Sequence, residues 1–434
     1  MAKLGQAQPR ARADVLGSLT TGAGRRELDN AMVESPISQH IDSVRTAAGP
    51  FVEFLTTSKW ASRIGAEEIC DFVVGNPHDM PLPAYVEAIQ RACLPLNPNW
   101  FGYKTNEPLA CRAAARSLHD RLGSQFESDD IFMTRGASSA LVIALSTILN
   151  PGDEVIFLSP PWFFYESMIA FCRGVPVRVS VDLKTFDLDV EAIAAAISPR
   201  TRAVIVNSPN NPTGKIYPPE TLERLGRALS LLSDEYGRAI YLLSDESYNR
   251  LIFDGRPFTS PTAYYPNSFL IYSYAKALLT PGQRLGYLAL PPSMPDRERM
   301  RSAIFTTQCS GYGFPDAVLQ HALPDLEPLC IDVNHLQRRR DVMINALRQQ
   351  GYDLSVPEGA WYLLPRSPIA DDKAFAGMLA DENVFVLPGS IVELPGYFRI
   401  SLTASDEMVA RSLPGFAAAI KAAELMHAVA ARPE

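Results

Sequence analysis

The central part of the chain alternates short apolar runs with amphipathic stretches. The apolar runs are rich in β-branched and aromatic residues, are bounded by Pro, Gly, Asp or Ser, and cover residues 154–159, 203–208, 240–244 and 269–273. This pattern is typical of buried strands. The stretches between them, such as 190–196 and 220–232, predict helices. Because strands alternate with helices, we predict an α/β fold in which helices cover both faces of a mainly parallel sheet.

The pattern changes beyond Pro315. A long helical stretch covers about residues 315–350, and short strand-like segments follow at 360–364, 384–387 and 397–401 before an Ala-rich closing helix. We therefore predict a large domain over residues 71–315 and a smaller α+β domain over residues 316–434. Residues 1–70 are predicted to form an N-terminal arm and a segment of the small domain.

Composition and charge remove several classes of function. The 434 residues are 47% hydrophobic and carry a formal net charge of −8, which argues against nucleic acid as the main partner. The six cysteines show no C-x-x-C spacing and no H-E-x-x-H motif occurs, so we expect no metal site. With sparse cysteines, no secretory signal and no apolar run of membrane length, we expect a soluble cytoplasmic protein without a membrane partner.

Three of the predicted strands lead into polar residues. Asn207 lies near the end of one run, Asp245 directly follows the next, and Ser273 ends the last. In open α/β sheets, ligands bind beyond the carboxyl ends of the strands. We therefore expect the functional site at this edge of the sheet.

Lys276 is the strongest candidate for covalent chemistry. It ends the segment Ser273-Tyr274-Ala275-Lys276, directly after a predicted buried strand, where an ammonium group is unusual. A lysine in a desolvated pocket can lose its proton and attack a carbonyl to form an imine, or Schiff base. Ser273 and Arg284 are suited to hold a phosphate. The alternative is a surface lysine at the start of a helix, which the flanking residues disfavour.

Two other segments supply polar groups for a ligand. Asn211 stands in the sequence N-N-P-T-G, which prolines and a glycine hold in a tight loop, and its amide can face a ligand oxygen. Asp245, in the sequence D-E-S-Y, can pair with a protonated pyridine nitrogen and keep that ring an electron sink. Tyr248 can donate a hydrogen bond to a phenolic oxygen of the same ring. A structural turn for Asn211 and a helix N-cap for Asp245 are the alternatives.

In this order, the segments resemble those of the class I/II aminotransferases, which are fold type I enzymes that depend on pyridoxal 5'-phosphate (PLP). The resemblance is carried by N-N-P-T-G, by D-x-S-Y and by S-Y-A-K followed by G-x-R-x-G, and it spans roughly residues 70–415. It implies a large PLP-binding domain beside a smaller α+β domain. It also implies transfer of an amino group between an α-amino acid and a 2-oxo acid through a Schiff base on Lys276.

The resemblance assigns a phosphate-binding role to a second segment. Gly136, Ala137 and Ser138 open a predicted helix, where backbone N–H groups can bind an anion. The resemblance implies that they hold the PLP phosphate together with Ser273 and Arg284. An ordinary helix cap is the alternative.

Further roles follow from the resemblance alone. Trp162 is similar to the aromatic residue that stacks on the cofactor ring beside the substrate. Tyr103 is similar to the tyrosine that reaches the phosphate of the neighbouring subunit, which implies a homodimer. Arg399 matches the arginine that binds the substrate α-carboxylate, since a guanidinium meets a carboxylate in bidentate fashion, and Asn211 is expected to orient that carboxylate with it. Gly75 matches a position where the backbone approaches the substrate.

Two departures from the family pattern leave the substrate open. Dicarboxylate-specific members need a second cation for the distal carboxylate, and none is identified here. The sequence K-T-N-E at 104–107 stands where Pro and Gly are expected after Tyr103. A PLP-dependent lyase, replacement or cyclisation enzyme on the same scaffold is therefore the alternative to an aminotransferase.

Overall fold

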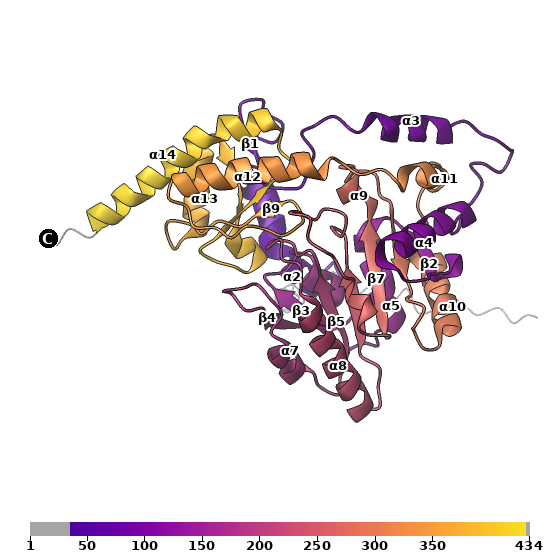
Figure 1. Ribbon diagram of the computed structural model, residues 1–434. Coiled ribbons are helices and arrows are strands. Elements are labelled where there is room, and N and C mark those ends of the chain that lie inside the picture. Colours follow the sequence, from indigo (N-terminus) through magenta and orange to yellow (C-terminus); the bar gives the residue numbers. More distant parts are fainter. Residues whose placement is uncertain (1–34, 431–434) are drawn as a thin grey trace, which may run out of the picture. The chain divides into compact units, whose positions relative to one another are not determined.

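The computed structural model of the protein describes residues 35–430, with side chains to residue 426 (Figure 1). The chain forms two compact units, Met1–Asp42 and Ser43–Glu434. In the first unit only residues 35–42 are described, including the start of helix α2 (Gln39–Thr57), so most of the predicted N-terminal arm lies outside the described residues. The candidate site belongs to the second unit.

A seven-stranded sheet forms the centre of the second unit. Its strand order is β2-β8-β7-β6-β5-β3-β4. Strands β7, β6, β5, β3 and β4 run parallel, and β8 runs antiparallel to its neighbours β2 and β7. The predicted α/β fold with a mainly parallel sheet is therefore confirmed. The strands are β2 (Ile131–Thr134), β3 (Glu154–Ser159), β4 (Val175–Ser180), β5 (Thr201–Asn207), β6 (Tyr241–Asp245), β7 (Ser268–Ser273) and β8 (Gly286–Ala289).

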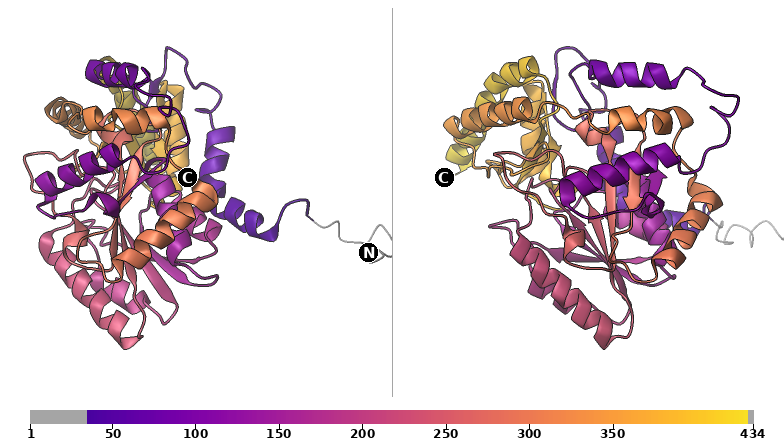
Figure 2. Two further views of the ribbon diagram at one scale, coloured as in Figure 1. Left: turned by 90° about the vertical axis from the view of Figure 1, so that its right-hand side faces the viewer. Right: turned by 45° about the vertical axis from the view of Figure 1, so that its right-hand side comes forward.

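Helices bury both faces of this sheet, as Figures 1 and 2 show. Phe157 of β3 lies in a core with α5 and α6, and the next residue, Leu158, lies in a separate core with α7 and α8. Because successive side chains enter opposite cores, the central strands are continuous apolar runs without polar alternation. The four helices are α5 (Gly136–Ile148), α6 (Tyr165–Phe171), α7 (Val190–Ala196) and α8 (Pro219–Glu235).

A third core packs helices against the β2, β8 and β7 end of the sheet. The predicted long helix at 315–350 is two helices in the structure, and only the first of them joins this core. Pro328 lies between the two, where it lacks an N–H for the helix ladder and restricts the residue before it. The helices of this core are α3 (Pro83–Ala92), α4 (Pro108–Leu122), α9 (Tyr274–Ala277) and α11 (Ala317–Leu326), whereas α10 (Arg297–Thr307) packs in the core of α5 through Ile304.

The C-terminal part builds a separate core around two small sheets. Strand β1 (Cys70–Asp71) pairs in parallel with β10 (Val384–Phe385), so a segment from before the large sheet joins this core. The second sheet has the order β11-β12-β9. The division at residue 315 stays a prediction. The remaining elements are β9 (Tyr362–Leu363), β11 (Leu387–Pro388), β12 (Phe398–Ser401), α12 (Val333–Gln349), α13 (Asp372–Asp381) and α14 (Asp406–Ala430).

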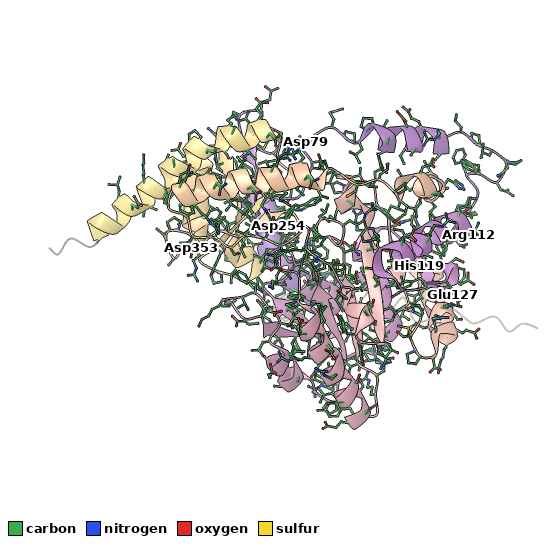
Figure 3. The ribbon with its side chains drawn as sticks, in the orientation of Figure 1. Asp79, Arg112, His119, Glu127, Asp254 and Asp353 are labelled. Carbon is green, nitrogen blue, oxygen red and sulfur yellow. The ribbon has the colours of Figure 1, made fainter. Side chains whose placement is uncertain are left out.

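Two buried arginines of α12 fix the segments that lead to the site. Arg339 donates to Asp79 at 3.0 Å and to Asp406 at 2.7 Å. Arg340 donates to both carboxylate oxygens of Asp254, at 2.7 and 2.8 Å. Figure 3 labels Asp79 and Asp254 on either side of this helix. Because both buried cations are paired, these contacts hold the chain firmly before α3 and after β6.

Within residues 35–430, no helix combines the length and the apolar character that crossing a bilayer requires.

Candidate active site

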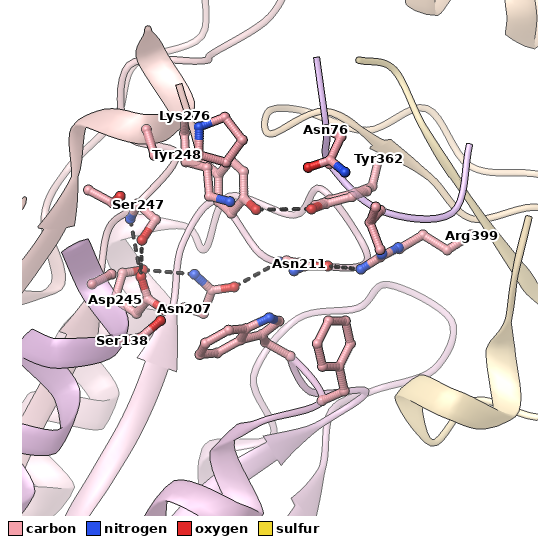
Figure 4. Close-up of a pocket in the computed structure, with 18 of the residues that line it drawn as sticks. Asn76, Ser138, Asn207, Asn211, Asp245, Ser247, Tyr248, Lys276, Tyr362 and Arg399 are labelled. Carbon is pink, nitrogen blue, oxygen red and sulfur yellow. Dashed lines mark hydrogen bonds between the residues drawn. The ribbon is translucent and has the colours of Figure 1, made fainter. Parts of the chain in front are cut away.

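A cavity of about 180 Å³ lies beyond the carboxyl ends of β5, β6 and β7 (Figure 4). Each of these strands ends in a residue that lines the cavity, as expected for an open α/β sheet. Two predicted site residues do not line it: Gly136 lies behind its wall, and Tyr103 lies in a neighbouring groove. The cavity brings together the other predicted residues, namely Gly75, Ala137, Ser138, Trp162, Asn211, Asp245, Tyr248, Ser273, Lys276, Arg284 and Arg399.

Lys276 stands in the short helix that directly follows β7, and it is partly buried. Its Nζ lies 5.5 Å from the centre of the Tyr248 ring and 5.1 Å from that of Trp361. Burial lowers the pKa of Lys276 below its ordinary value, although Tyr362 and Asp245 act in the opposite direction. Burial thus shifts the equilibrium of Lys276 towards the neutral amine, the form that acts as a nucleophile. Lys276 takes part in none of the lysine ion pairs of residues 35–430, which involve Lys59, Lys104 and Lys215.

Asp245 is a buried carboxylate held by neutral donors. The hydroxyls of Tyr165 and Ser247 each donate to it at 2.7 Å. Asn207 donates to the Asp245 backbone carbonyl at 2.9 Å. Burial raises the pKa of Asp245, while these hydroxyls and the charge of Lys276 lower it in part. A buried acid in this setting gains most from a ligand cation in contact with it.

Arg399 is almost fully buried, with 1% of its surface exposed. It donates to Asn211 at 2.9 Å and to the backbone carbonyl of Val73 at 2.8 Å, and its Nε has no partner among residues 35–430. Its guanidinium lies 4.2 Å from the centre of the Tyr362 ring. Burial lowers the pKa of Arg399, and no carboxylate pairs with it in the described chain. A buried guanidinium with a free donor is suited to an anionic ligand.

The first turn of α5 and Arg284 form an end of the cavity that is suited to an anion. Ala137 and Ser138 line the cavity at this helix start, where N–H groups have no partner within the helix. Ser273 and Arg284 line the same cavity. Arg284 donates to the carbonyl of Pro281 at 2.6 Å. Together these groups offer backbone, hydroxyl and guanidinium donors to a phosphate.

Glycine is required where this end of the cavity is built. Gly136 has φ +79°, and a Cβ there would lie 2.7 Å from Nη2 of Arg284. Gly286 packs directly on Gly136, because a Cβ on Gly286 would lie 2.8 Å from the Gly136 Cα. The predicted role of Gly136 thus becomes indirect: it makes room for Arg284 beside the helix start.

Aromatic residues surround the space between these charged groups. Trp162 and Phe163 line the cavity, and the Trp162 ring meets the Tyr165 ring edge-on at 5.5 Å. Gly75 lies against Trp361, because a Cβ at Gly75 would be 3.1 Å from its ring. The cavity therefore offers flat apolar surfaces to a planar ligand.

Several residues of the site received no role from the sequence, although Asn207 stood out as a strand-end residue. Asn207 accepts the backbone N–H of Asn211 at 2.7 Å and so orders the loop that carries it. Its place at a strand end was the available signal. Tyr362 lines the cavity from β9, which no motif marks. The others are Asn76, Tyr165, Ser247 and Phe163.

A mainly parallel sheet with a lysine, a carboxylate and an arginine grouped at its carboxyl edge is the arrangement of fold type I PLP-dependent enzymes. The chain matches the family described as "Aminotransferase class I and II" over residues 67–414 and belongs to it. It is a PLP-dependent aminotransferase, an enzyme that transfers an amino group between an amino acid and a 2-oxo acid. The predicted family, fold type and activity are confirmed.

Curated relatives and solved structures agree with this assignment. The chain is 32% identical to the aspartate/prephenate aminotransferase of Thermus thermophilus, over 81% of this chain and 90% of that protein. It is 33% identical to an aspartate aminotransferase of Rhizobium meliloti, over 80% of this chain and 87% of that protein. An aminotransferase structure from Eubacterium rectale superposes with a TM-score of 0.79 at 27% identity, covering 93% of this chain and 99% of that one.

The residues of the cavity fit PLP and an amino acid. PLP carries an aldehyde, a ring nitrogen that can hold a proton and a phosphate, and the substrate adds a carboxylate. Lys276 can take the aldehyde, Asp245 the ring nitrogen and Arg399 the carboxylate. Arg284 and the backbone N–H groups at the start of α5 can bind the phosphate. Each charged side chain of the cavity thereby gains a partner that the described chain alone does not provide.

Proposed function

We propose that the protein binds PLP covalently through Lys276 and uses it to move an amino group between an α-amino acid and a 2-oxo acid. The observation that carries this proposal is the group formed by Lys276, Asp245 and Arg399. All three line one small cavity, and none forms an ion pair within the described chain. The cavity that they share also has aromatic walls, which suit a planar cofactor together with an amino acid.

The chain's own residues divide the chemical work. Arg399 and Asn211 bind and orient the substrate carboxylate, and Trp162 and Phe163 exclude water from the reacting face. When bound, the cofactor supplies a ring that accepts the electron pair released at the substrate Cα. The amine of Lys276, which the substrate amine would release from its bond to the cofactor, would take the Cα proton and return a proton on the cofactor side, as a general base and then a general acid. Asp245 holds the positive charge on the ring nitrogen.

We further propose that Tyr103 serves the site of a second copy of this chain in a homodimer. Tyr103 is fully exposed and lines a groove that also includes Arg284. Large apolar side chains are exposed near it in sequence, with Leu96 78% and Phe101 56% exposed. Exposed apolar surface of this kind favours association, and two-fold dimers are the commonest closed assembly.

The names of the relatives suggest a dicarboxylate as one substrate, and the composition of the cavity suggests a neutral side chain. The cations that line the cavity in the described chain are Lys276, Arg284 and Arg399, and each already has a proposed partner. We propose a cytoplasmic location on separate grounds, because all six cysteines are free thiols.

A two-stage assay tests the proposed function. PLP-loaded protein is mixed with single amino acids, and the expected result is one equivalent of 2-oxo acid by mass spectrometry. Repeated turnover is expected only after a second 2-oxo acid is added. Continuous product formation without an added 2-oxo acid would contradict amino transfer and indicate elimination or replacement.

A further inference from the structure

Tyr362 lies between the end of the cavity that carries Arg399 and the end that carries Lys276. It belongs to β9, the edge strand paired with β12, and its register partner Ser401 lies two residues beyond Arg399. Only 3% of its surface is exposed, and it lines the cavity. Its hydroxyl lies 3.2 Å from that of Tyr248, as the dashed line in Figure 4 shows. Tyr362 thus contacts Arg399 on one side and, on the other, Tyr248, whose ring lies near Lys276.

At one end of the cavity, the charge of Arg399 acts on the aromatic ring of Tyr362. The Arg399 guanidinium lies 4.2 Å from the ring centre, a distance at which a cation is attracted to an aromatic face. A cation there withdraws charge from the phenol and makes its O–H a better donor. The ring in turn supports a guanidinium whose hydrogen-bond acceptors in the described part of the chain are Asn211 and Val73.

At the other end of the cavity, the amino group of Lys276 lies near Tyr248. The Nζ of Lys276 lies over the Tyr248 ring at 5.5 Å, and the two tyrosine rings meet edge-on at 5.9 Å. Burial raises the pKa of both phenols, but for Tyr362 the charges of Arg399 and Lys276 outweigh this and bring its pKa below 10.0. The pKa of Tyr248 stays well above that value, because burial, Tyr362 and Asp245 all raise it.

The nearer cation favours one direction for the hydrogen bond between the two phenols, because the Arg399 guanidinium lies 4.2 Å from the centre of the Tyr362 ring whereas the Lys276 Nζ lies 5.5 Å from that of Tyr248. In a pair of hydroxyls, the more acidic one donates and the more basic one accepts. Tyr362 therefore donates to the oxygen of Tyr248, and the proton of Tyr248 remains available for a third group. A hydroxyl that accepts one hydrogen bond becomes a stronger donor in the next.

We propose that Tyr362 is a positioning residue for Tyr248: it donates to the Tyr248 oxygen and thereby directs and strengthens the hydrogen bond that Tyr248 gives to the cofactor's phenolic oxygen. This inference rests on the proposed function, since it requires PLP on Lys276. The charged and titratable groups that face the pair are Arg399 from β12, Lys276 from α9 and Asp245 from β6.

The inference is tested with Tyr362→Phe, which keeps the ring beside Arg399 and removes only the hydroxyl. The readout is the pH at which the visible absorbance of the PLP-loaded protein changes. Weaker donation to the phenolic oxygen lets the Lys276 nitrogen hold its proton more tightly, so the midpoint should rise. Loss of one such hydrogen bond corresponds to about 0.4 to 1 pH unit. The KM for the amino acid should change less than about threefold, because the ring remains.

Tyr352→Phe is the matched control. Tyr352 belongs to the same buried core as Tyr362, and its hydroxyl donates one hydrogen bond, to the Phe416 carbonyl at 2.9 Å. This variant loses a comparable buried contact away from the cavity. Its unfolding midpoint should fall with that of Tyr362→Phe, and its absorbance midpoint should match the wild type.

A double variant separates positioning from direct contact. If Tyr362 acts through Tyr248, adding Tyr362→Phe to Tyr248→Phe moves the absorbance midpoint no further. The inference is overturned if Tyr362→Phe leaves the absorbance midpoint unchanged, or if it shifts the midpoint equally in the Tyr248→Phe background. In either case the visible absorbance band of the wild-type protein with PLP would still support the proposed function. A wild-type protein that gives no band with PLP overturns both.

Discussion

At the scale of single residues, the site is defined by charges that the described chain leaves uncompensated. Arg399 is the clearest case: it is buried, it is held by two neutral acceptors, and it keeps a free donor. Maintaining such a group is unfavourable unless a ligand offsets the desolvation. Function, more than stability, therefore explains its place in the core.

Replacing Arg399 by Lys should separate substrate binding from cofactor binding. A lysine keeps the charge and loses the planar pair of donors, so we expect the KM for amino acids to rise by about 10- to 100-fold. PLP loading, followed by absorbance, should remain complete. The control is Arg366→Lys, because Arg366 also lies over a tyrosine ring, that of Tyr397 at 5.0 Å, but its side chain is 60% exposed. An equal rise in both variants would argue against a carboxylate site at Arg399.

Glu246, next to Asp245, gives a prediction for stability. It is fully buried and accepts hydrogen bonds from Ser244, Asn249 and Ser260. Burial raises the pKa of Glu246 from 4.5 to about 7, against the effect of these donors. The pKa of Glu246 is higher in the folded than in the unfolded protein. Its contribution to the free energy of unfolding is therefore complete below pH 4.5 and is lost as the pH rises through about 7.

The loss should amount to at most about 3 kcal/mol of unfolding free energy. Urea unfolding of the apo protein at pH 5 and pH 8 measures it. In Glu246→Gln the difference between the two pH values should shrink by a comparable amount. If the variant shows the same pH dependence as the wild type, Glu246 does not titrate in this range.

At the scale of elements, the start of α5 and strand β8 together form the end of the cavity that we propose for the phosphate. Gly136 and Gly286 let the two backbones approach, and Arg284 occupies the space that a side chain at Gly136 would take. The sequence motif G-x-R-x-G thus encodes a packing relation between elements that are far apart along the chain. This relation could not be predicted from the motif alone, because it depends on the antiparallel pairing of β2 with β8.

Gly136→Ala should weaken PLP binding more than it weakens the fold. The new Cβ displaces Arg284, and the positive φ adds about 1 kcal/mol of strain. Gly123→Ala is the control, since Gly123 ends α4 with φ +71° and a Cβ there would meet no atom within 4 Å. Both variants should lose similar stability by thermal unfolding. Only Gly136→Ala should raise the Kd for PLP, by roughly tenfold or more; equal Kd values would contradict the role of Arg284.

At the scale of the whole molecule, the sequence predicted the sheet, its helical cover and most of the cavity. Those features depend on local apolar runs and on strand-end residues such as Asn207 and Asp245. The sequence did not predict that Tyr362 and Tyr165 belong to the site, because each reaches the site only through tertiary packing. The helix expected at 315–350 was wrong as one element, since Pro328 separates two helices that join different cores.

The proposed homodimer gives a prediction at this scale. Leu96→Asp places a charge on exposed apolar surface near Tyr103, and we expect a lower mass by light scattering and weaker PLP binding. Leu425→Asp on α14, where the wild-type side chain is 67% exposed, is the control and should leave both unchanged. A full-mass assembly with normal PLP binding in Leu96→Asp would argue against this face as the subunit contact.

The covalent role of Lys276 is tested most directly by borohydride reduction of the PLP-loaded protein, followed by peptide mass spectrometry. We predict one pyridoxyl adduct, on the peptide that carries Lys276, and none in Lys276→Ala. Lys215, a partly buried lysine paired with Glu358, serves as an internal control and should stay unmodified. An adduct on another lysine in place of Lys276, or an unchanged adduct in the Lys276→Ala variant, would contradict the covalent role of this residue.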